Sequence, residues 1–516
     1  MTFDTTTSST PDIILDPARA AFGPQETCEN LGAAHFIGIG GAGMSVLAEM
    51  LHERGVRVDG SDRERGAKTE RLEALGVRVE IGQRAENVED ADTVVYSSAI
   101  KLDNPEIRAA ADKGLRIVHR SDILALLMHG RRAVTVAGAH GKTTTSSMLA
   151  HILQGCGADP SYAIGGSIQT AEGVVDGGHV GSGAALVAEA DESDGSFDKY
   201  RPEIAVVTNC EADHLDHYGD ADRYRAAFVR HAGHATGHVV ICADDPDALA
   251  VLRALEPSVA ARAVAYGTAE ETDLEADGGL HGAAYVHIES ESESAGTGEE
   301  RFTLRLPAAV TGGEDVGLPV TLAVPGLHNA RNAAAALTAA VLLGEDPLEA
   351  AASAATFRGA ARRFQVRGIV KRVTVVDDYA HHPTEISALM DAARRRYPKG
   401  AVRVLFQPHL FSRTEIFARE FAEALAKADD VIVTGIFPAR ERQADFPQVG
   451  PRTIADRAPE EARGRFRCVD DMHVAAQMMA MRAHHGDVVF TVGAGDVTAM
   501  GDVILHALEA HREGCE

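Results

Sequence analysis

The segment RRAVTVAGAHGKTTTSSMLAHIL, residues 131–153, constrains the fold of this chain more than any other. An apolar run is followed at once by a glycine loop and then by a helical pattern. Glycines let the backbone turn tightly, so that amide N–H groups at a helix N-terminus face an anion. Lys142 can reach the outer phosphates of a nucleotide, and the Thr143 hydroxyl can hold Mg²⁺. The segment therefore predicts a parallel sheet with a phosphate-binding loop. The predicted nucleotide-binding residues of this loop are Gly138, Ala139, His140, Gly141, Lys142, Thr143 and Thr144.

This loop is shorter than the loop of ordinary P-loop GTPases and motor proteins. Their pattern requires a glycine five positions before the final Gly-Lys, and Val136 stands at that position. The sequence therefore argues against those two classes of nucleotide-binding protein.

Short apolar strands alternate with helical stretches along most of the chain, which is typical of α/β folds. A length of 516 residues suggests about three domains. We expect an α/β protein with three tandem domains: a Rossmann-like N-terminal domain, a central P-loop ATPase-like domain and a Rossmann-like C-terminal domain. The predicted limits are a flexible tail at 1–32 and domains at 33–131, 132–358 and 359–516. The acidic stretch at about 268–316 is expected to be a surface loop or a hairpin.

Composition narrows the cellular setting. A net charge of -26 without a basic patch argues against nucleic-acid binding. Six widely spaced cysteines without a CxxC pair argue against a disulfide framework and a zinc site, and favour a reducing compartment. No apolar run reaches the roughly 18 residues of a membrane span, and the first residues do not resemble a secretory signal. We expect a cytoplasmic protein without membrane segments, and the oligomeric state stays open.

Carboxylates and histidines follow two predicted strands of the central unit. Glu189 begins the cluster in AEADESDGS, and His214 lies in TNCEADHLDHY. Nucleotide chemistry needs a divalent metal on hard oxygen ligands, sometimes with an imidazole. The predicted metal ligands are Thr143, Glu189 and His214. Most of the other carboxylates in the cluster are expected to be solvated turns.

Eight motifs, in register from about residue 34 onward, resemble those of the Mur ligase family. They are HFIGIGGAGMSVLAEML, GAHGKTTT, AEADESD, TNCEADHLD, PGLHNARNAAAAL, DDYAHHPTE, FQPHLFSRT and GAGD. The resemblance implies a cell-wall ligase with Mg²⁺ and ATP. It would phosphorylate the carboxylate of UDP-N-acetylmuramate and join the acyl phosphate to L-alanine. The three domains would then bind the UDP-sugar, ATP and the amino acid in turn.

The resemblance also implies roles for individual residues. Lys142 would bind phosphate, Thr143 and Glu189 would hold one Mg²⁺, and His214 would hold a second. Asn329 and Asn332 match the asparagines on the adenine side. The chain departs from the family motifs at Ala139, Ala380, Leu410 and Gln365, where the family usually has Thr, Gly, Arg and an acidic residue. A carbamylated lysine just after the His214 motif is excluded, because no lysine occurs between Lys199 and Lys371.

The N-terminal glycine motif has two interpretations. Gly38, Gly40 and Gly43 form G-x-G-x-x-G after a strand, with Asp62 about 20 residues on, which alone is a dinucleotide fingerprint of an oxidoreductase. The physical requirement is a pyrophosphate at a helix N-terminus, and UDP supplies one as NAD does. The phosphate loop at 138–144 favours UDP. For Asp62 and the two serines 97 and 98 the alternative is capping of helices and turns. The predicted sugar-nucleotide contacts are Gly38, Gly40, Gly41, Gly43, Met44, Asp62, Ser97 and Ser98.

Polar side chains crowd two strand ends of the third unit. Arg413 is predicted to pair bidentately with a carboxylate of alanine or of the sugar substrate. His382 is predicted to orient the amine or the acyl phosphate. The alternative is structural, with the histidines capping strands and Asp377 paired with an arginine. Arg363 could serve phosphate or domain docking. The predicted catalytic residues of the whole chain are Lys142, His214, His382 and Arg413, and the further substrate contacts are Arg363, Tyr379, His381 and His409.

Other functions stay open at this point. A recycling ligase that adds a peptide to UDP-N-acetylmuramate and a folate-polyglutamate ligase would share the ATP loop. The HFIGIGGAGM start favours the UDP-muramate branch over folate. A Rossmann oxidoreductase and a non-catalytic nucleotide-binding regulator are the remaining alternatives.

Overall fold

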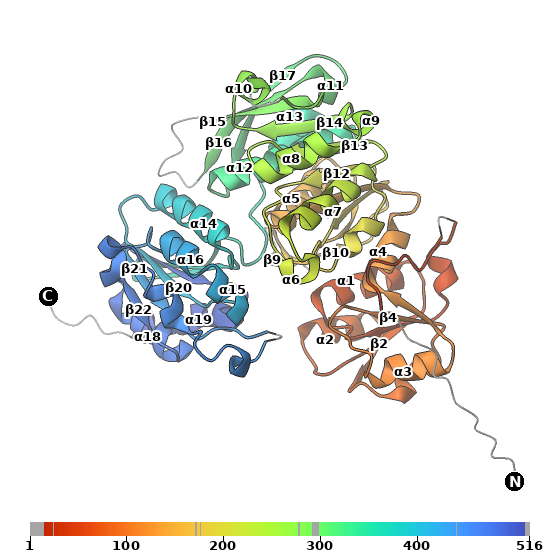
Figure 1. Cartoon of the computed structure of the whole chain (residues 1–516), viewed down its shortest axis with the longest axis horizontal. Helices are drawn as coiled ribbons and strands as arrows, with labels where there is room; N and C mark the ends of the chain where they lie inside the picture. Colours follow the sequence, from red (N-terminus) through yellow and green to blue (C-terminus); the bar gives the residue numbers. More distant parts are fainter. Residues whose placement is uncertain are drawn as a thin grey trace, which may run out of the picture.

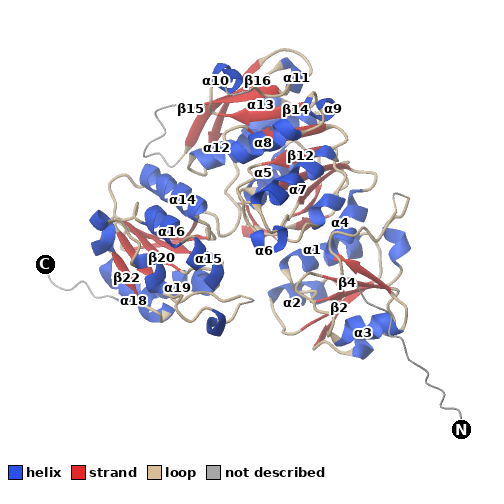
Figure 2. Ribbon diagram, viewed as in Figure 1, coloured by secondary structure: helices blue, strands red, loops and turns tan. Residues whose placement is uncertain are grey.

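The computed structural model describes residues 15–23, 25–170, 173–175, 177–276, 279–290, 299–439 and 441–510. Three large sheets follow one another along the chain, in three lobes that Figure 1 colours red to orange, yellow to green, and cyan to blue. Helices cover the faces of each sheet (Figure 2). The predicted α/β class with three tandem units is confirmed.

The N-terminal sheet has five parallel strands in the order β3-β2-β1-β4-β5. The strand order reverses between β1 and β4, and ligands bind parallel sheets at such a switch point. The glycine motif follows β1 and the two serines at 97 and 98 follow β4, so both lie at the switch. The elements are η1 Cys28–Leu31, β1 Ala34–Ile37, α1 Ala42–Glu53, β2 Val58–Asp62, α2 Ala67–Ala74, β3 Arg78–Ile81, η2 Ala85–Val88, β4 Thr93–Tyr96, α3 Pro105–Asp112, β5 Arg116–His119 and α4 Arg120–Met128.

The end of the expected flexible tail differs from the prediction. Residues Cys28–Leu31 form a 3-10 helix, and Leu31 is fully buried in the hydrophobic core. The backbone N–H of Ala21 donates to Asp122 Oδ1 at 3.0 Å. Burial of Leu31, with Phe22 and Cys28 packed against the same core, fixes this segment, although its polar composition suggested a mobile chain. Residues 1–14 and 24 lie outside the described part.

The central sheet has ten strands in the order β10-β7-β11-β6-β12-β13-β14-β15-β16-β17. Strand β6 lies between β11 and β12, so the phosphate loop and both carboxylate motifs leave the same edge of the sheet. The strands are β6 Arg132–Ala137, β7 Ser161–Ala163, β8 Ile168–Thr170, β9 Gly173–Val175, β10 Gly178–His179, β11 Ala185–Glu189, β12 Ile204–Val207, β13 His238–Cys242, β14 Ala263–Gly267, β15 Ala284–Ser290, β16 Glu300–Leu306 and β17 Val316–Leu322, with β8 and β9 forming a separate hairpin. The helices are α5 Lys142–Gly155, η3 Ser196–Lys199, α6 Leu215–Tyr218, α7 Ala221–Gly233, α8 Pro246–Ala254, α9 Pro257–Ala260, α10 Glu271–Ala276, α11 Ala308–Thr311, α12 Leu327–Leu342 and α13 Pro347–Ala354.

The acidic stretch at 268–316 contains a hairpin, one of the two predicted possibilities. Strands β15 and β16 pair antiparallel, and β17 continues the sheet beyond them. Residues 291–298, at the tip, lie outside the described part.

The C-terminal sheet has six strands in the order β18-β19-β23-β20-β21-β22, with β18 antiparallel at one edge. Strands β19, β23 and β20 are adjacent, so the DDYAHH, GAGD and FQPH motifs leave neighbouring strand ends. The strands are β18 Gln365–Val370, β19 Val373–Asp378, β20 Val402–Phe406, β21 Asp430–Val433, β22 Phe466–Cys468 and β23 Val488–Val492. The helices are α14 Pro383–Arg396, α15 Phe411–Ile416, α16 Ala418–Leu425, η4 Gln443–Asp445, α17 Pro451–Ala455, η5 Glu460–Arg465, α18 Met472–Arg482, η6 Asp496–Ala499 and α19 Met500–Ala510.

The hydrophobic cores divide the molecule unevenly. One cluster of buried residues runs from the N-terminal sheet into the central one, from Phe36 and Leu47 to Phe197 and Tyr224. Helix α1 packs so closely on β10 that a Cβ added at Gly178 would lie 3.0 Å from Val46 Cγ1. The C-terminal sheet has separate clusters on its two faces. The first two units therefore share apolar packing that the third does not.

Five cysteines in the described ranges are free thiols, at positions 28, 156, 210, 242 and 468. In the same ranges no helix has the length and apolar character needed to cross a membrane.

Candidate active site

The phosphate loop depends on glycine at two positions. Gly138 and Gly141 have positive φ angles of 142° and 83°, a region that glycine occupies at little cost. A Cβ at Gly138 would lie 2.1 Å from Thr208 Oγ1, and one at Gly141 would lie 2.7 Å from Asn332 Oδ1. Helix α5 begins directly after the loop. The sequence therefore folds here into a cradle that points the helix N-terminus at an anion.

Lys142 folds back onto its own loop. Its Nζ donates to Gly138 O at 2.5 Å and to the Glu192 carboxylate at 2.9 and 3.0 Å. Burial lowers the pKa of Lys142, but the surrounding carboxylates, with Glu192 first, outweigh burial and raise it. Lys142 is therefore charged, and a phosphate that enters the loop can replace one of its present partners.

Glu192 is a site residue that sequence reasoning did not single out. It is fully buried, and its Oε1 lies 3.7 Å from His214 Nε2. Burial raises the pKa of Glu192 to about 7, although Lys142 lowers it. Burial also lowers the pKa of His214, against the raising effect of Asp213. Glu192 thus links two predicted catalytic residues. Its position in a run of four acids gave no signal that this one is buried.

Thr143 and Glu189 lie together, as a shared metal ion would require. The Thr143 hydroxyl donates to both Glu189 oxygens at 3.1 Å, and the Gly165 N–H donates to Glu189 Oε2 at 2.9 Å. A hydroxyl and a carboxylate are hard oxygen donors of the kind that Mg²⁺ prefers, so these residues fit that ion. The third predicted ligand, His214, lies beside Glu192 and Asp213, with both carboxylates 3.7 Å from its Nε2.

A cavity of about 420 Å³ lies between the N-terminal and central units. Arg120 crosses this boundary and donates to Asp191 Oδ2 at 2.9 Å. The cavity therefore brings the N-terminal glycine loop and the phosphate loop to one place. Its lining includes Gly41, Gly43, Met44, Ser97, Arg120, Lys142, Glu189 and Asp191.

Two predicted N-terminal contacts, Asp62 and Ser98, have hydrogen-bond partners within the protein. Asp62 Oδ2 accepts a hydrogen bond from the Gly40 N–H at 2.8 Å, which fixes the glycine turn. Ser98 donates to Asp194 Oδ2 at 2.5 Å, across the boundary between the two units. For Asp62 the structure shows the turn-capping alternative that the sequence left open. The glycine motif also includes Gly38, which has a φ of 76°.

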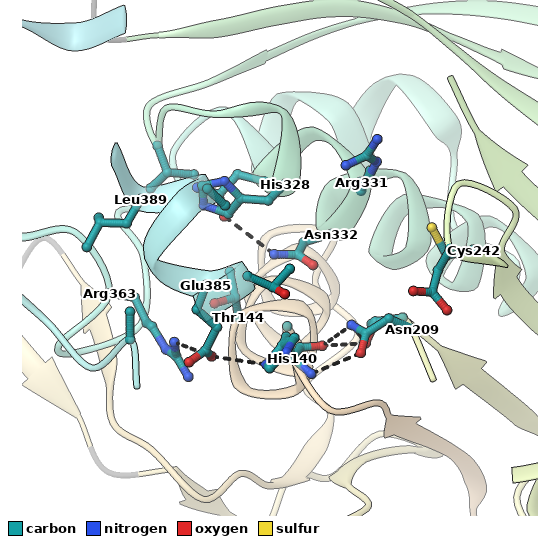
Figure 3. A pocket seen from close by; sticks show the side chains of 18 of the residues that line it. His140, Thr144, Asn209, Cys242, His328, Arg331, Asn332, Arg363, Glu385 and Leu389 are labelled. Carbon is teal, nitrogen blue, oxygen red and sulfur yellow. Dashed lines mark hydrogen bonds and ion pairs between the residues drawn. The ribbon is translucent and has the colours of Figure 1, made fainter. Parts of the chain in front are cut away.

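A second cavity of about 310 Å³ lies between the central and C-terminal units (Figure 3). His140, Gly141 and Thr144 of the phosphate loop line it, together with Asn329 and Asn332 of α12. Asn329 Nδ2 donates to Pro325 O at 2.7 Å, which holds the asparagine at the start of this helix. The loop and the two predicted adenine-side asparagines are therefore brought together in one pocket.

The C-terminal unit contacts the phosphate loop through a buried polar cluster. His140 Nε2 lies 3.1 Å from Glu211 Oε2, and its Nδ1 lies 3.4 Å from Glu385 Oε1. Burial lowers the pKa of His140, but Glu385 and Glu211 outweigh burial and raise it to about 9. The His382 ring lies 4.8 Å from the His140 ring, and burial, with His140 as a neighbour, lowers the pKa of His382 to about 4. The Thr384 hydroxyl donates to Glu211 Oε1 at 2.7 Å.

The remaining predicted C-terminal residues have partners within the protein. Arg413 donates to both oxygens of Asp213 at 2.9 and 3.0 Å. The Asp377 carboxylate accepts from Arg362 Nε at 3.0 Å, which confirms the arginine pairing of the structural alternative. Two predicted substrate contacts lie beside Glu385: Arg363 at 3.1 Å and His381 at 3.2 Å. A third, Tyr379, has its ring under the guanidinium groups of Arg362 and Arg363. His409 stacks on Phe437 with ring centres 5.8 Å apart.

Comparisons with known proteins identify the family. The model described as Mur ligase family, catalytic domain matches residues 33–132. The Mur ligase middle domain matches residues 136–340, and the Mur ligase, glutamate ligase domain matches residues 362–495. The N-terminal glycine motif lies within the first of these matches, which overturns the oxidoreductase alternative.

Relatives match over nearly the whole chain. A UDP-N-acetylmuramate–L-alanine ligase of Bifidobacterium longum subsp. infantis is 69% identical over 509 residues, which are 98% of this chain and 99% of that protein. The enzyme of the same name from Paenarthrobacter aurescens is 46% identical over 93% of this chain and 98% of its own length. A crystal structure of a UDP-N-acetylmuramate-alanine ligase from Thermotoga maritima matches with a TM-score of 0.73 at 28% identity, covering 93% of this chain and 99% of that one. The chain belongs to the Mur ligase family.

Proposed function

We propose that this chain is an ATP-dependent ligase that joins L-alanine to the carboxylate of UDP-N-acetylmuramate in peptidoglycan synthesis. The observation that carries the proposal is the shared cavity, where the N-terminal glycine loop, Lys142 and Glu189 face one space. The relative that is 69% identical over 98% of the chain carries this activity in its name, which supports alanine over a peptide as the second substrate.

The proposed reaction has two steps. The substrate carboxylate attacks the γ-phosphoryl group of ATP, which gives an acyl phosphate and ADP. The amine of alanine then attacks the acyl carbon, so that the amide bond forms, phosphate leaves and the amine loses a proton. Activation is needed because a carboxylate oxygen is a poor leaving group.

Lys142 and the backbone amides of the phosphate loop would supply the positive charge that this reaction needs. Two anions, the carboxylate and the γ-phosphate, must meet, and fixed positive charge at their meeting point stabilises the transition state. Lys142 is charged and lines the cavity between the N-terminal and central units. When phosphate replaces Glu192 as its partner, the buried Glu192 carboxyl, with its pKa of about 7, can take up a proton.

Thr143 and Glu189 are the residues that would hold Mg²⁺, and His214 is the proposed ligand of a second ion. Mg²⁺ supplies positive charge beside the phosphates when it is bound. The close pair of Thr143 and Glu189, 3.1 Å apart, supports this assignment. His214 with its lowered pKa is neutral at pH 7, as an imidazole ligand must be.

The C-terminal unit is proposed to receive the amino acid. Arg413 is a guanidinium that can exchange its Asp213 partner for a substrate carboxylate. His382 is neutral at pH 7, because its pKa is lowered to about 4, and can accept a hydrogen bond from an amine. We further propose the domain roles that the family implies: UDP-sugar at 33–131, ATP at 132–358 and amino acid at 359–516.

The test is release of ADP and phosphate by the purified chain with Mg²⁺, ATP and UDP-N-acetylmuramate, with single amino acids added in turn and the sugar product weighed by mass spectrometry. Release that depends on L-alanine, with one alanine residue added to the sugar, is the expected result. Release only with a tripeptide would move the chain to the recycling ligases. No release in any combination would overturn the proposal.

A further inference from the structure

Three side chains with metal-ligating atoms converge where the C-terminal unit meets the phosphate loop. They are His140 of the loop, Glu211 after strand β12, and His382 at the start of helix α14. One ligand atom from each lies within 4.8 Å of the other two. Among the residues that the structure describes, this is the one such group of three.

We propose that these residues form a transition-metal site, for which Zn²⁺ is the natural probe, and that the bound ion fixes the C-terminal unit onto the phosphate loop. Two imidazoles and one carboxylate are a typical donor set for Zn²⁺, whereas Mg²⁺ prefers oxygen ligands alone. The site is therefore distinct in chemistry from the Thr143–Glu189 pair. The wide spacing of the cysteines does not bear on it, because no thiolate is needed.

The His382 side chain is the independent sign of a missing partner. It is 3% exposed, and neither of its ring nitrogens has a hydrogen-bond partner in the described part of the chain. A buried imidazole without partners is costly, because its polar atoms have lost water. Its Nδ1 faces Glu211 Oε1 at 3.7 Å, which is too far for a hydrogen bond but leaves room for an ion to bridge the two.

The distances between the ligand atoms of these three residues allow a metal ion to bind after the atoms move slightly closer together. Bonds of about 2.0–2.2 Å in a tetrahedron place neighbouring ligand atoms roughly 3.3 Å apart. His140 Nε2 and Glu211 Oε2 are already 3.1 Å apart. His382 Nδ1 and the other oxygen of that carboxylate, Glu211 Oε1, are 3.7 Å apart. The two imidazole rings, 4.8 Å apart, are the pair that must approach.

The local charge also favours a cation. Glu211 and Glu385 both face His140, at 3.1 and 3.4 Å from its ring nitrogens, so two carboxylates are in place to balance the charge of a divalent ion.

The site has a position relevant to nucleotide binding. His140 and Glu211 also line the pocket between the central and C-terminal units, so the bound ion would lie at the edge of the proposed nucleotide site. This position rests on the proposed ATP site, whereas metal binding itself does not.

The test is equilibrium dialysis of the full chain against Zn²⁺, with excess Mg²⁺ and no nucleotide. The wild type is expected to hold one more Zn²⁺ per chain than Glu211→Gln or His382→Gln, or to bind that ion at least tenfold more tightly. The exposed His485→Gln serves as the matched control and should equal the wild type. Equal stoichiometry and affinity in the wild type and both ligand variants would overturn the proposal.

A second measurement needs no variant and so does not depend on their folding. Crystals of the wild type grown with Zn²⁺ are measured at the zinc absorption edge. An anomalous peak between His140, Glu211 and His382 is the expected result, and its absence from that position contradicts the proposal. Because dialysis and diffraction use no substrate, a failed ligase assay leaves their outcome unaffected.

Discussion

Arg413 of helix α15 donates through Nη2 to both oxygens of Asp213, a residue 200 positions earlier in the loop after β12. Both side chains are largely buried, with exposed fractions of 9% and 13%. This bond connects the C-terminal unit to the central one directly beside His214.

Replacing the guanidinium should loosen this boundary. Arg413→Met leaves a buried carboxylate without its cation, which costs about 3 kcal/mol. We expect hydrogen exchange in residues 211–219 and 411–417 to become about 100-fold faster. The matched control is Arg419→Met on helix α16, where the side chain is exposed and its partners lie on the surface. Unchanged exchange in Arg413→Met would show that the pair does not hold the units together.

Lys142→Met should nearly abolish the proposed ligase turnover. The lysine is the fixed charge at the proposed phosphate site, and loss of one such group costs about 3 kcal/mol or a factor of 100–1,000 in rate. Initial rates of ADP release measure the effect. Lys113→Met, at the exposed end of helix α3, is the control and should keep wild-type rates. A variant at position 142 that keeps most of its turnover would refute the assigned role.

Glu189→Gln should change the dependence on Mg²⁺. The amide keeps the shape of the side chain but removes the charge of the proposed metal ligand, so the Mg²⁺ concentration for half-maximal rate should rise at least tenfold. Rates are measured against Mg²⁺ at fixed ATP. Glu203→Gln is the control, because Glu203 forms an ion pair with Arg132 at the start of strands β6 and β12, far along the sheet from the loop. The same Mg²⁺ dependence in both variants would argue against the assignment.

His231 gives a prediction for stability against pH. It is fully buried, its Nδ1 lies 3.0 Å from Phe197 O, and its ring stacks on Phe197. Burial lowers its pKa from 6.5 to about 4, with His234 and Arg201 also lowering it and Asp198 raising it. Protonation therefore favours the unfolded chain. The stability that this histidine contributes is present above pH 6.5 and is lost as the pH falls toward 4, by about 3 kcal/mol in total.

The measurement compares wild type with His231→Asn, which keeps a donor for Phe197 O. Urea unfolding is followed by circular dichroism at pH 8, 6, 5 and 4. The difference in midpoint between the two proteins should shrink as the pH falls. A constant difference would mean that His231 does not titrate in this range.

The fold and the loops of the site could be predicted because their signals are local. The strand, glycine loop and helix at 131–153 are contiguous, and glycine at 138 and 141 permits the positive φ angles that the loop needs. The pairing of Thr143 with Glu189 was implied by the resemblance to the Mur ligase family. The structure places the two residues together because β6 and β11 are neighbours in a parallel sheet, with Thr143 in the helix that follows β6 and Glu189 at the end of β11.

The contacts between units could not be predicted, because they depend on how finished domains pack. Glu211 meets Thr384 across 173 positions of sequence. Nothing in the composition of either loop marks that meeting. Glu192 was missed for a related reason. It faces both Lys142 and His214, and these contacts depend on the folded structure. Leu31 shows the opposite error, since it is buried in the core with Phe22 and Cys28 packed beside it and so anchors a segment that looked mobile.

The uneven division of the hydrophobic cores has a mechanical consequence. The N-terminal and central units are joined by apolar packing, as at Val46 and Gly178, which resists sliding because it has no alternative partners in water. The C-terminal unit meets the central one through polar pairs such as Arg413 and Asp213, in which each charged group can be solvated by water when the two units separate. The N-terminal and central units are therefore held together by a shared hydrophobic core, and the boundary with the C-terminal unit is the one that opens more easily. We expect substrate entry and product release to open the boundary with the C-terminal unit and to leave the boundary between the first two units closed.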